Sequence, residues 1–284
     1  MPKPTAILLI SCPDQRGIVA RLSGFVYEQG GNIVDSDHHS DLQAGRFLGR
    51  IEWEPEGEDF DRAGLRAGLA LVAGAMGGKW ELHFSDARPR IAIACSRQEH
   101  CLLDLLWRHQ AGELGGELAL VFSNHELLRH HVEPLGLPFH CLPVAPDTKD
   151  AQEARQLELL RRERVELLVL AKYMQVLSPS FLAAFPNVIN IHHSFLPAFA
   201  GAQPYHQAHA RGVKIIGATA HFVTADLDAG PIIEQDVVRV SHRDTVQDLV
   251  RKGRDMERLA LARAVRLHLQ RRVLTYDNKT VVFE

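Results

Sequence analysis

The chain has 284 residues, of which 46% are hydrophobic and 24% charged, and its formal net charge is −3. This composition is ordinary for a soluble globular protein and excludes a disordered tail, a collagen-like fibre and a disulfide-stapled miniprotein. A chain without a basic field does not gather phosphates, so we expect no binding to nucleic acid.

The cysteines and the apolar runs indicate the cellular compartment in which the protein works. The 4 cysteines (Cys12, Cys95, Cys101 and Cys141) show no CxxC spacing, which suits buried thiols in a reducing compartment. The apolar run from Ala6 to Ile10 is too short for a signal peptide, and no run is long enough to cross a membrane. We therefore expect a cytoplasmic protein that does not associate with membranes.

The first part of the chain alternates strand and helix patterns. In chain order, the predicted elements are a strand over residues 5–11, a helix carrying Ile18 to Val26, strands at 33–34 and 47–53, a helix carrying Leu65 to Met76 and a strand over 80–84. Asp14 is a candidate N-cap of the first helix, and Ala44-Gly45 is the expected turn between the second and third strands. The order is β-α-β-β-α-β, the ferredoxin-like pattern.

The segment Cys12-Pro13-Asp14-Gln15-Arg16-Gly17-Ile18-Val19 resembles the first loop and helix start of ACT domains. The resemblance implies a domain that binds a small amino acid and makes its parent enzyme a homo-oligomer. Asp14 and Gly17 are then the candidate effector-binding residues, because free N–H groups at a helix start suit a carboxylate. The alternative is that Gly17 only permits close helix–strand approach and that the domain is an oligomerisation scaffold.

The polar segment Ser85 to Pro89 predicts a boundary between an ACT-like domain over 1–86 and a catalytic domain over 87–284. Beyond it, short apolar runs alternate with helical stretches. The runs lie at 91–95, 118–122, 139–142, 165–171 and 188–191, followed by one at 215–223. Strands spaced by helices predict a doubly wound, mostly parallel sheet, whose ligands lie outside the carboxyl ends of the strands.

Two strand ends carry reactive side chains. Asn190 and His192 lie two residues apart on an extended segment and should point to one side, with His193 pointing away. The following strand leads to Asp228. An amide, an imidazole and a carboxylate can together stabilise an oxyanion and move a proton without a metal.

These motifs resemble the formyltetrahydrofolate-dependent formyltransferase family. The matching segments are Asn190-Ile191-His192, Ser194 to Pro197, His221 to Thr224 and Leu227 to Pro231. The resemblance implies that Asn190, His192 and Asp228 form the catalytic set and that the substrate is a folate. It also implies that the pterin lies against a loop made of Met174, Gln175, Val176 and Leu177 and against Thr224 and Leu227.

Further motifs, Tyr173 to Ser178 and Gly201 to Ala208, resemble those family members that join an ACT domain to the catalytic domain and use water as the acceptor. A formyltransferase that holds a sugar phosphate needs a glycine-rich loop after the first strand. Here that loop, Ser96 to Cys101, has no glycine, and His193 stands where many transferases have proline. We therefore expect hydrolysis of 10-formyltetrahydrofolate, with the formate feeding purine synthesis and the reaction balancing folate pools.

Two other functions stay open at this point: formyl transfer to an amine acceptor, and a catalytically dead regulator that responds to an amino acid. Retention of all three catalytic residues speaks against the regulator. Whether burial raises the pKa of Asp228 or a neighbouring imidazolium lowers it is also open.

The remaining candidates have plainer interpretations. Of the 16 histidines, His206 and His209 form a helical pair that surface exposure explains as well as a metal does, and we expect no metal. His221 and Ser194 are expected to support the site, while Asp226 is a decoy for Asp228. The charge-rich stretches 153–164 and 251–272 predict solvated helix faces.

Overall fold

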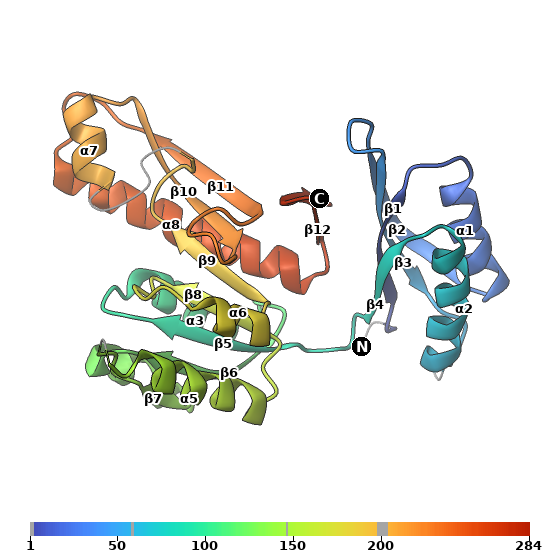
Figure 1. Cartoon of the computed structure of the whole chain (residues 1–284), viewed down its shortest axis with the longest axis horizontal. Coiled ribbons are helices and arrows are strands. Elements are labelled where there is room, and N and C mark those ends of the chain that lie inside the picture. Colours follow the sequence, from blue (N-terminus) through green and yellow to red (C-terminus); the bar gives the residue numbers. More distant parts are fainter. Residues whose placement is uncertain (1–2, 58–59, 146, 198–203) are drawn as a thin grey trace. The chain divides into compact units, whose positions relative to one another are not determined.

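The computed structural model describes residues 3–57, 60–145, 147–197 and 204–284. The chain forms two compact units (Figure 1). Unit 1 comprises residues 1–88 together with 270–284, and unit 2 comprises residues 89–269. Across the described residues, no helix combines the length and the apolarity that a membrane span requires.

Unit 1 has the β-α-β-β-α-β order that the sequence predicts. Its elements are β1 (Ala6–Pro13), α1 (Ile18–Glu28), β2 (Asn32–Asp41), β3 (Arg46–Glu54), α2 (Arg62–Ala75) and β4 (Lys79–Phe84). The strands pair antiparallel in the order β2-β3-β1-β4. Leu8 and Ile10 of β1 alternate with Leu9, so they pack against Leu22 and Leu69 of the two helices while Leu9 faces the other side.

The start of α1 differs from the prediction. Asp14 does not cap the helix; the N-cap is Gly17, and no side chain bonds to the first turn. Gly17 has φ 84°, and a Cβ there would meet nothing within 4 Å. Glycine is therefore favoured by the left-handed backbone and not by close helix–strand approach. Asp14 is exposed, and its backbone N–H donates to the Gly45 carbonyl over 2.9 Å.

The C-terminal segment packs with unit 1. It forms the hairpin β12 (Val273–Tyr276) and β13 (Lys279–Val282), and its Leu274 and Phe283 join Leu9 and Leu48 in one hydrophobic cluster. The sequence predicts a catalytic domain that extends to residue 284, whereas residues 270–284 pack in unit 1 on the open face of its sheet. A short hairpin cannot bury its apolar side alone, so it needs such a surface.

Unit 2 contains β5 (Arg90–Cys95), α3 (His100–Gln110), β6 (Glu117–Ser123), η1 (Glu126–Leu128), α4 (Arg129–Val132), η2 (Glu133–Leu135), β7 (Phe139–Cys141), α5 (Lys149–Arg162), β8 (Leu167–Ala171), α6 (Pro179–Ala184), β9 (Val188–His192), α7 (Pro204–Arg211), β10 (Ile215–Phe222), β11 (Ile232–Arg239) and α8 (Val246–Leu269). The sheet order is β11-β10-β9-β8-β5-β6-β7. Helices α5 and α6 pack on one face through the cluster around Phe122 and Leu160. Helices α3 and α8 pack together, and α8 lies along β9, β10 and β11.

The expectation of a mostly parallel sheet is confirmed for β7, β6, β5, β8 and β9. Strand β10 instead runs antiparallel to both β9 and β11. The carboxyl ends of β9 and β10 therefore lie at opposite edges, and residues after β10 must turn back to reach the end of β9.

Candidate active site

Strand β9 presents Asn190 and His192 beside β10. Asn190 lies opposite His221, and His192 lies opposite Thr219. Nδ2 of Asn190 is 3.3 Å from Nε2 of His221, whose Nδ1 is 2.9 Å from the Phe222 carbonyl oxygen. Because a carbonyl only accepts, Nδ1 of His221 is the donor there, and a neutral His221 then accepts the Asn190 amide at Nε2.

Asp228 reaches this pair from the loop that follows β10. Its Oδ2 lies 3.2 Å from Nδ1 of His192, and its Oδ1 lies 3.7 Å from Nε2 of His221. The loop turns back tightly because Gly230 has no side chain: a Cβ there would stand 1.8 Å from the Phe222 carbonyl oxygen. Asp228 itself adopts φ 54°, a left-handed conformation that is uncommon outside glycine and recurs at functional sites.

An imidazole neighbour decides the charge of Asp228. The hydrogen bond from His192 holds the pKa of Asp228 well below its usual range. The side chain is 18% exposed, yet its burial is outweighed. Asp228 is therefore a carboxylate at neutral pH, and the question that the sequence left open is answered by this imidazole neighbour. Asp226 is exposed, and its backbone carbonyl accepts from the Thr224 hydroxyl over 3.0 Å and from the Ala229 N–H over 3.4 Å.

His192 has one used and one unused nitrogen. Nδ1 faces the carboxylate and so carries the proton, which makes Nε2 of a neutral ring an acceptor. Nε2 is buried and has no hydrogen-bond partner within the described part of the chain, and the same holds for Oγ of Ser194. Buried polar atoms are normally bonded, so an unsatisfied nitrogen on an oriented ring indicates a place for a ligand or water.

His193 does not simply point away. Its ring stacks on that of His192, with centroids 4.6 Å apart and planes 21° apart, and its Nδ1 lies 3.3 Å from Nζ of Lys172. Lys172 comes directly after β8, is 4% exposed and has φ 60°. Sequence reasoning missed this lysine, since no motif draws attention to the residue before the Tyr173 loop.

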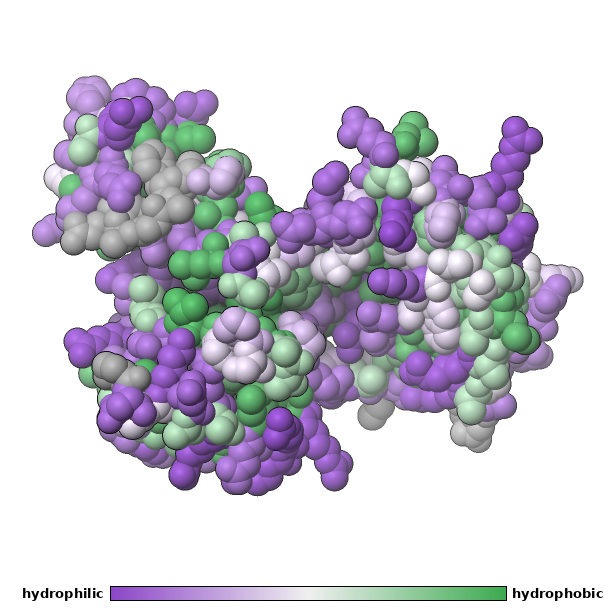
Figure 2. All heavy atoms as spheres, viewed as in Figure 1, coloured by the Kyte–Doolittle hydropathy of each residue, from purple (hydrophilic) through white to green (hydrophobic). Residues whose placement is uncertain are grey.

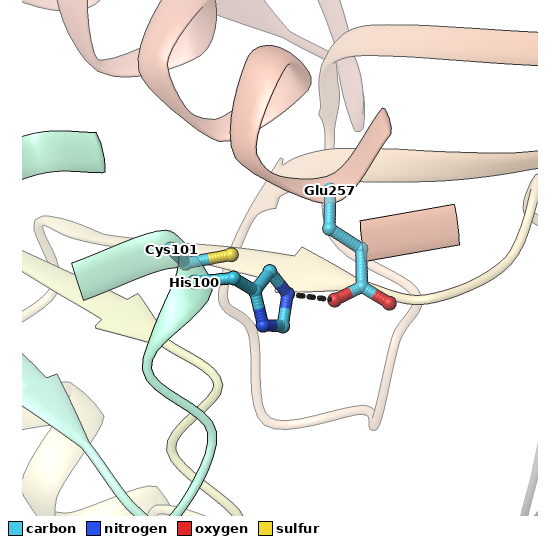
Figure 3. A group of neighbouring side chains, drawn as sticks. All are labelled: His100, Cys101 and Glu257. Carbon is cyan, nitrogen blue, oxygen red and sulfur yellow. Dashed lines mark hydrogen bonds and ion pairs between the residues drawn. The ribbon is translucent and has the colours of Figure 1, made fainter. Parts of the chain in front are cut away.

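Lys172 belongs to a set of buried polar side chains that we call the switch-point cluster: Lys172, Glu257, His100 and Tyr205. Glu257 of α8 accepts from Nε2 of His100 over 2.6 Å and from the Tyr205 hydroxyl over 2.8 Å, and Nζ of Lys172 is 3.3 Å away. Figure 3 shows His100, at the start of α3, pointing to the carboxylate of Glu257. Burial raises the pKa of Glu257, but the bond from His100 and the charge of Lys172 outweigh it and lower that pKa to about 2.

Glu257 corrects the expectation that both charge-rich stretches are solvated faces. It is 1% exposed, and Glu153 in α5 is 5% exposed. The signal was present in the sequence, because Glu257 falls on the apolar stripe formed by Leu249, Gly253, Ala260 and Leu261. Glu153 is held by Ser178, whose backbone N–H and hydroxyl both donate to its carboxylate.

His100, Cys101 and Glu257 are grouped closely enough to suggest a metal site, since their ligand atoms lie within 4.8 Å of one another (Figure 3). The donor set does not suit a metal. Nε2 of His100, the Tyr205 hydroxyl and Nζ of Lys172 already contact the Glu257 carboxylate, and burial raises the pKa of the Cys101 thiol well above its ordinary value.

The predicted substrate-binding residues lie mostly at the surface of unit 2. Met174, Val176 and Leu227 are 60%, 57% and 69% exposed, respectively. Hydrophobic residues do appear among hydrophilic ones on the visible face of this unit (Figure 2). Gln175 and Thr224 are half-buried, while Leu177 is buried in the core with Phe181, so its side chain contributes to packing.

The Tyr173 to Ser178 loop has a rigid base. The Tyr173 hydroxyl accepts amide N–H bonds from Gln152 and Gln156, over 3.0 and 2.8 Å. The backbone N–H of Met174 donates to Oγ of Ser96 over 2.9 Å, which joins the loop to the end of β5. In the second motif, Gly201 to Ala208, the residues 201–203 lie outside the described part, and α7 begins at Pro204 as expected.

Three comparisons place this geometry among known proteins. The pattern of the family described as "Formyl transferase" matches residues 89–265. A formyltetrahydrofolate deformylase of Synechocystis sp. is 56% identical over 100% of this chain and 100% of its own.

Solved structures agree. A formyltetrahydrofolate deformylase from Pseudomonas syringae superposes with a TM-score of 0.97 at 47% identity, covering 100% of this chain and 96% of that one. A glycinamide ribonucleotide transformylase from Symbiobacterium toebii has a TM-score of 0.66 at 32% identity and covers 72% of this chain and 98% of its own. The similarity to the deformylases thus includes the region before residue 89, which the family pattern does not reach.

Proposed function

This chain belongs to the formyltetrahydrofolate deformylases of the formyl transferase family, and from that premise we propose that it hydrolyses 10-formyltetrahydrofolate to formate and tetrahydrofolate. Asn190, His192 and Asp228 are the catalytic side chains. The observation that carries this assignment is the buried, unpartnered Nε2 of His192 within the described residues, on a ring whose Nδ1 is fixed 3.2 Å from the Asp228 carboxylate.

Hydrolysis proceeds by attack of water on the formyl carbon. Nε2 of His192 accepts a proton from the water while the new C–O bond forms, and Asp228 stabilises the resulting imidazolium. The proton then passes from His192 to N10 as the C–N10 bond breaks, which leaves tetrahydrofolate and formate. The low pKa of Asp228 makes it a poor proton acceptor, so His192 is the base and Asp228 orients it.

Asn190 stabilises the oxyanion of the tetrahedral intermediate. One N–H of its amide is directed to His221 by the 3.3 Å contact, and the second N–H is available to the substrate oxygen. A preorganised donor of this kind is commonly worth ~3 kcal/mol of barrier. His221 is a positioning residue, because it acts on substrate only through Asn190 and Asp228.

The folate lies against the two surface segments that the family resemblance indicates. Exposed apolar side chains at Met174, Val176 and Leu227 offer contact area for a pterin or its aromatic linker. Gln175 and Thr224 supply polar contacts, and Leu177 anchors the loop in the core. No cofactor or metal takes part; an ion found at one equivalent in purified protein would contradict this.

Formyl transfer to an amine is the second candidate, favoured by the likeness to the transformylase structure. The two reactions differ in whether an amine acceptor must be present. The full-length protein should release formate from 10-formyltetrahydrofolate with no amine present, and added glycinamide ribonucleotide should not divert the formyl group. Turnover only with the amine would establish a transferase, and no turnover in either case would establish a regulator.

Unit 1 is an ACT domain in this proposal. Support comes from the β-α-β-β-α-β order, the sheet order β2-β3-β1-β4 and the segment Cys12 to Val19. Asp14 and Gly17, at the start of α1, are the proposed contacts for an amino-acid effector, and the domain makes the enzyme a homo-oligomer. All 4 cysteines are free, which supports a reducing, cytoplasmic location, where the released formate would supply purine synthesis.

A further inference from the structure

In the sheet of unit 2, the strand order reverses between β5 and β8, and side chains fill the space at this switch point. The chain builds β5, β6 and β7 toward one edge and then returns to place β8 on the other side of β5. At the carboxyl ends of these two strands, Cys95 lies beside Ala171. Doubly wound sheets bind ligands in the crevice at this point, yet here Lys172 and the residues that follow β5 fill it with the switch-point cluster.

Burying the charged groups of this cluster costs the fold their hydration free energy. Lys172 and Glu257 have side chains that are 4% and 2% exposed, and their Nζ and Oε2 atoms are 3.3 Å apart. Buried ion pairs lose about as much hydration as they gain in attraction, so they are weak stabilisers. Lys172 also adopts φ 60°, where a lysine is strained and a glycine is not. The burial of a strained lysine and a carboxylate at this point therefore points to a role beyond stability.

The cluster lies between the catalytic ring and the outside. On its inner side, Lys172 contacts His193, which stacks on His192 at 4.6 Å. On its outer side, His100 lines two pockets of about 530 and 650 Å³. The smaller pocket is also lined by Arg251, Arg254 and Arg258 with Asp255, and the larger by Arg97, Arg254 and Arg258 with Glu99 and Asp104. Arginines outnumber carboxylates in both, so the pockets favour an anionic molecule.

From this placement we propose that the switch-point cluster excludes an amine co-substrate from His192 and thereby determines that water is the acceptor. The inference rests on the proposed hydrolytic function and concerns its specificity. An anionic amine can occupy the arginine-lined pockets, but Glu257, Lys172 and His193 stand between those pockets and the formyl carbon. Water does not have to pass through those pockets to reach the formyl carbon.

Opening the cluster should allow transfer. The amine nitrogen would bond to the formyl carbon, the C–N10 bond would break, and one proton of the amine would pass to N10. The products are then tetrahydrofolate and an N-formyl amine, with no formate and no change in oxidation state.

The test uses the full-length double variant Lys172→Gly/Glu257→Gln. Glycine accepts the left-handed backbone, and glutamine avoids leaving a buried carboxylate without its counter-ion. The matched control is Arg164→Gly, which removes another cationic side chain at positive φ (52°) from an exposed turn. Each protein is given 10-formyltetrahydrofolate and glycinamide ribonucleotide, an amine with an anionic phosphate, and formate and the N-formylated ribonucleotide are both quantified against an enzyme-free blank.

In wild type and Arg164→Gly, formation of the N-formylated ribonucleotide should stay at the level of the enzyme-free blank, whereas the double variant should form it at roughly tenfold or more that level, the scale of one opened contact region. If the double variant does not fold by circular dichroism, Lys172→Gly alone decides the matter, since it removes one side chain of the barrier and leaves Glu257 bonded to His100 and Tyr205. Formation of the N-formylated ribonucleotide at the blank level in every folded variant overturns the inference while leaving hydrolysis intact. Absence of formate from wild type would instead refute the proposed function.

Discussion

Oδ2 of Asp228 lies 3.2 Å from Nδ1 of His192, although Asp228 lies in the loop after β10, a strand that runs antiparallel to the β9 strand of His192. The contact depends on Gly230, which lets the loop after β10 turn back tightly against Phe222. It also depends on the left-handed conformation of Asp228. It places the proton of His192 on Nδ1 and leaves Nε2 as the acceptor, the atom that meets the water in the proposed mechanism.

Replacing Asp228 by asparagine should lower the turnover number by ~10²–10⁴-fold, the range for a disrupted general acid–base pair. The amide can donate to Nδ1 and so favour the wrong tautomer of His192. The matched control is Asp226→Asn in the same loop, whose exposed carboxylate has no side-chain bond within the described residues. Normal turnover in a folded Asp228→Asn protein would remove Asp228 from the mechanism.

Asn190→Ala should reduce kcat far more than it raises KM for 10-formyltetrahydrofolate. Loss of an oxyanion donor acts on the transition state, and a fall of ~10²–10³-fold in kcat is expected. Steady-state kinetics measure the split between the two constants. A rise in KM that equals the fall in kcat/KM would mean that Asn190 only binds the folate.

Much of this arrangement could be predicted from the sequence. The β-α-β-β-α-β order of unit 1 follows from hydrophobic spacing and from glycines that end helices, and these signals are local. The pairing of Asn190 with His192 follows from strand alternation. The antiparallel course of β10 could not be predicted, because a strand's direction depends on where a long connection returns and not on the residues of the strand.

The predictions that the structure contradicts failed for related physical reasons. The hairpin at residues 273–282 belongs to unit 1 because its apolar side fits a sheet face formed by residues far earlier in the chain. The sequence predicts a solvated face for Glu257 because acidic residues are mostly exposed. A buried carboxylate is stable there because the fold brings Lys172 and His100 next to it, and this proximity is not visible in the local sequence.

The Phe283→Ala variant tests the placement of the hairpin. Phe283 is 1% exposed and packs with Leu9, Leu48 and Leu274, so its loss should lower the free energy of unfolding by about 3–5 kcal/mol. Urea titration followed by circular dichroism measures this. Exposed Leu71, 77% accessible, provides the control, since Leu71→Ala should change stability little. An equal response in the two variants would show that the hairpin does not cover the sheet.

Glu257 predicts a pH dependence of stability. Its pKa is lowered from 4.5 to about 2 in the folded protein, so its contribution is fully present above pH 4.5 and is lost as the pH falls toward 2. Glu257→Gln should therefore be less stable than wild type at pH 7, and the difference should shrink as the pH falls from about 4.5 to about 2. The exposed Glu158→Gln serves as control. A difference that stays constant with pH would mean that Glu257 is not ionised in the folded state.

The most direct test of the account is the source of the oxygen in the product. The full-length protein is incubated with 10-formyltetrahydrofolate in H₂¹⁸O, and the released formate is analysed by mass spectrometry. Attack by water at His192 predicts one ¹⁸O atom in each formate formed above the enzyme-free rate. Formate without the label, or no enzyme-dependent formate, would contradict it.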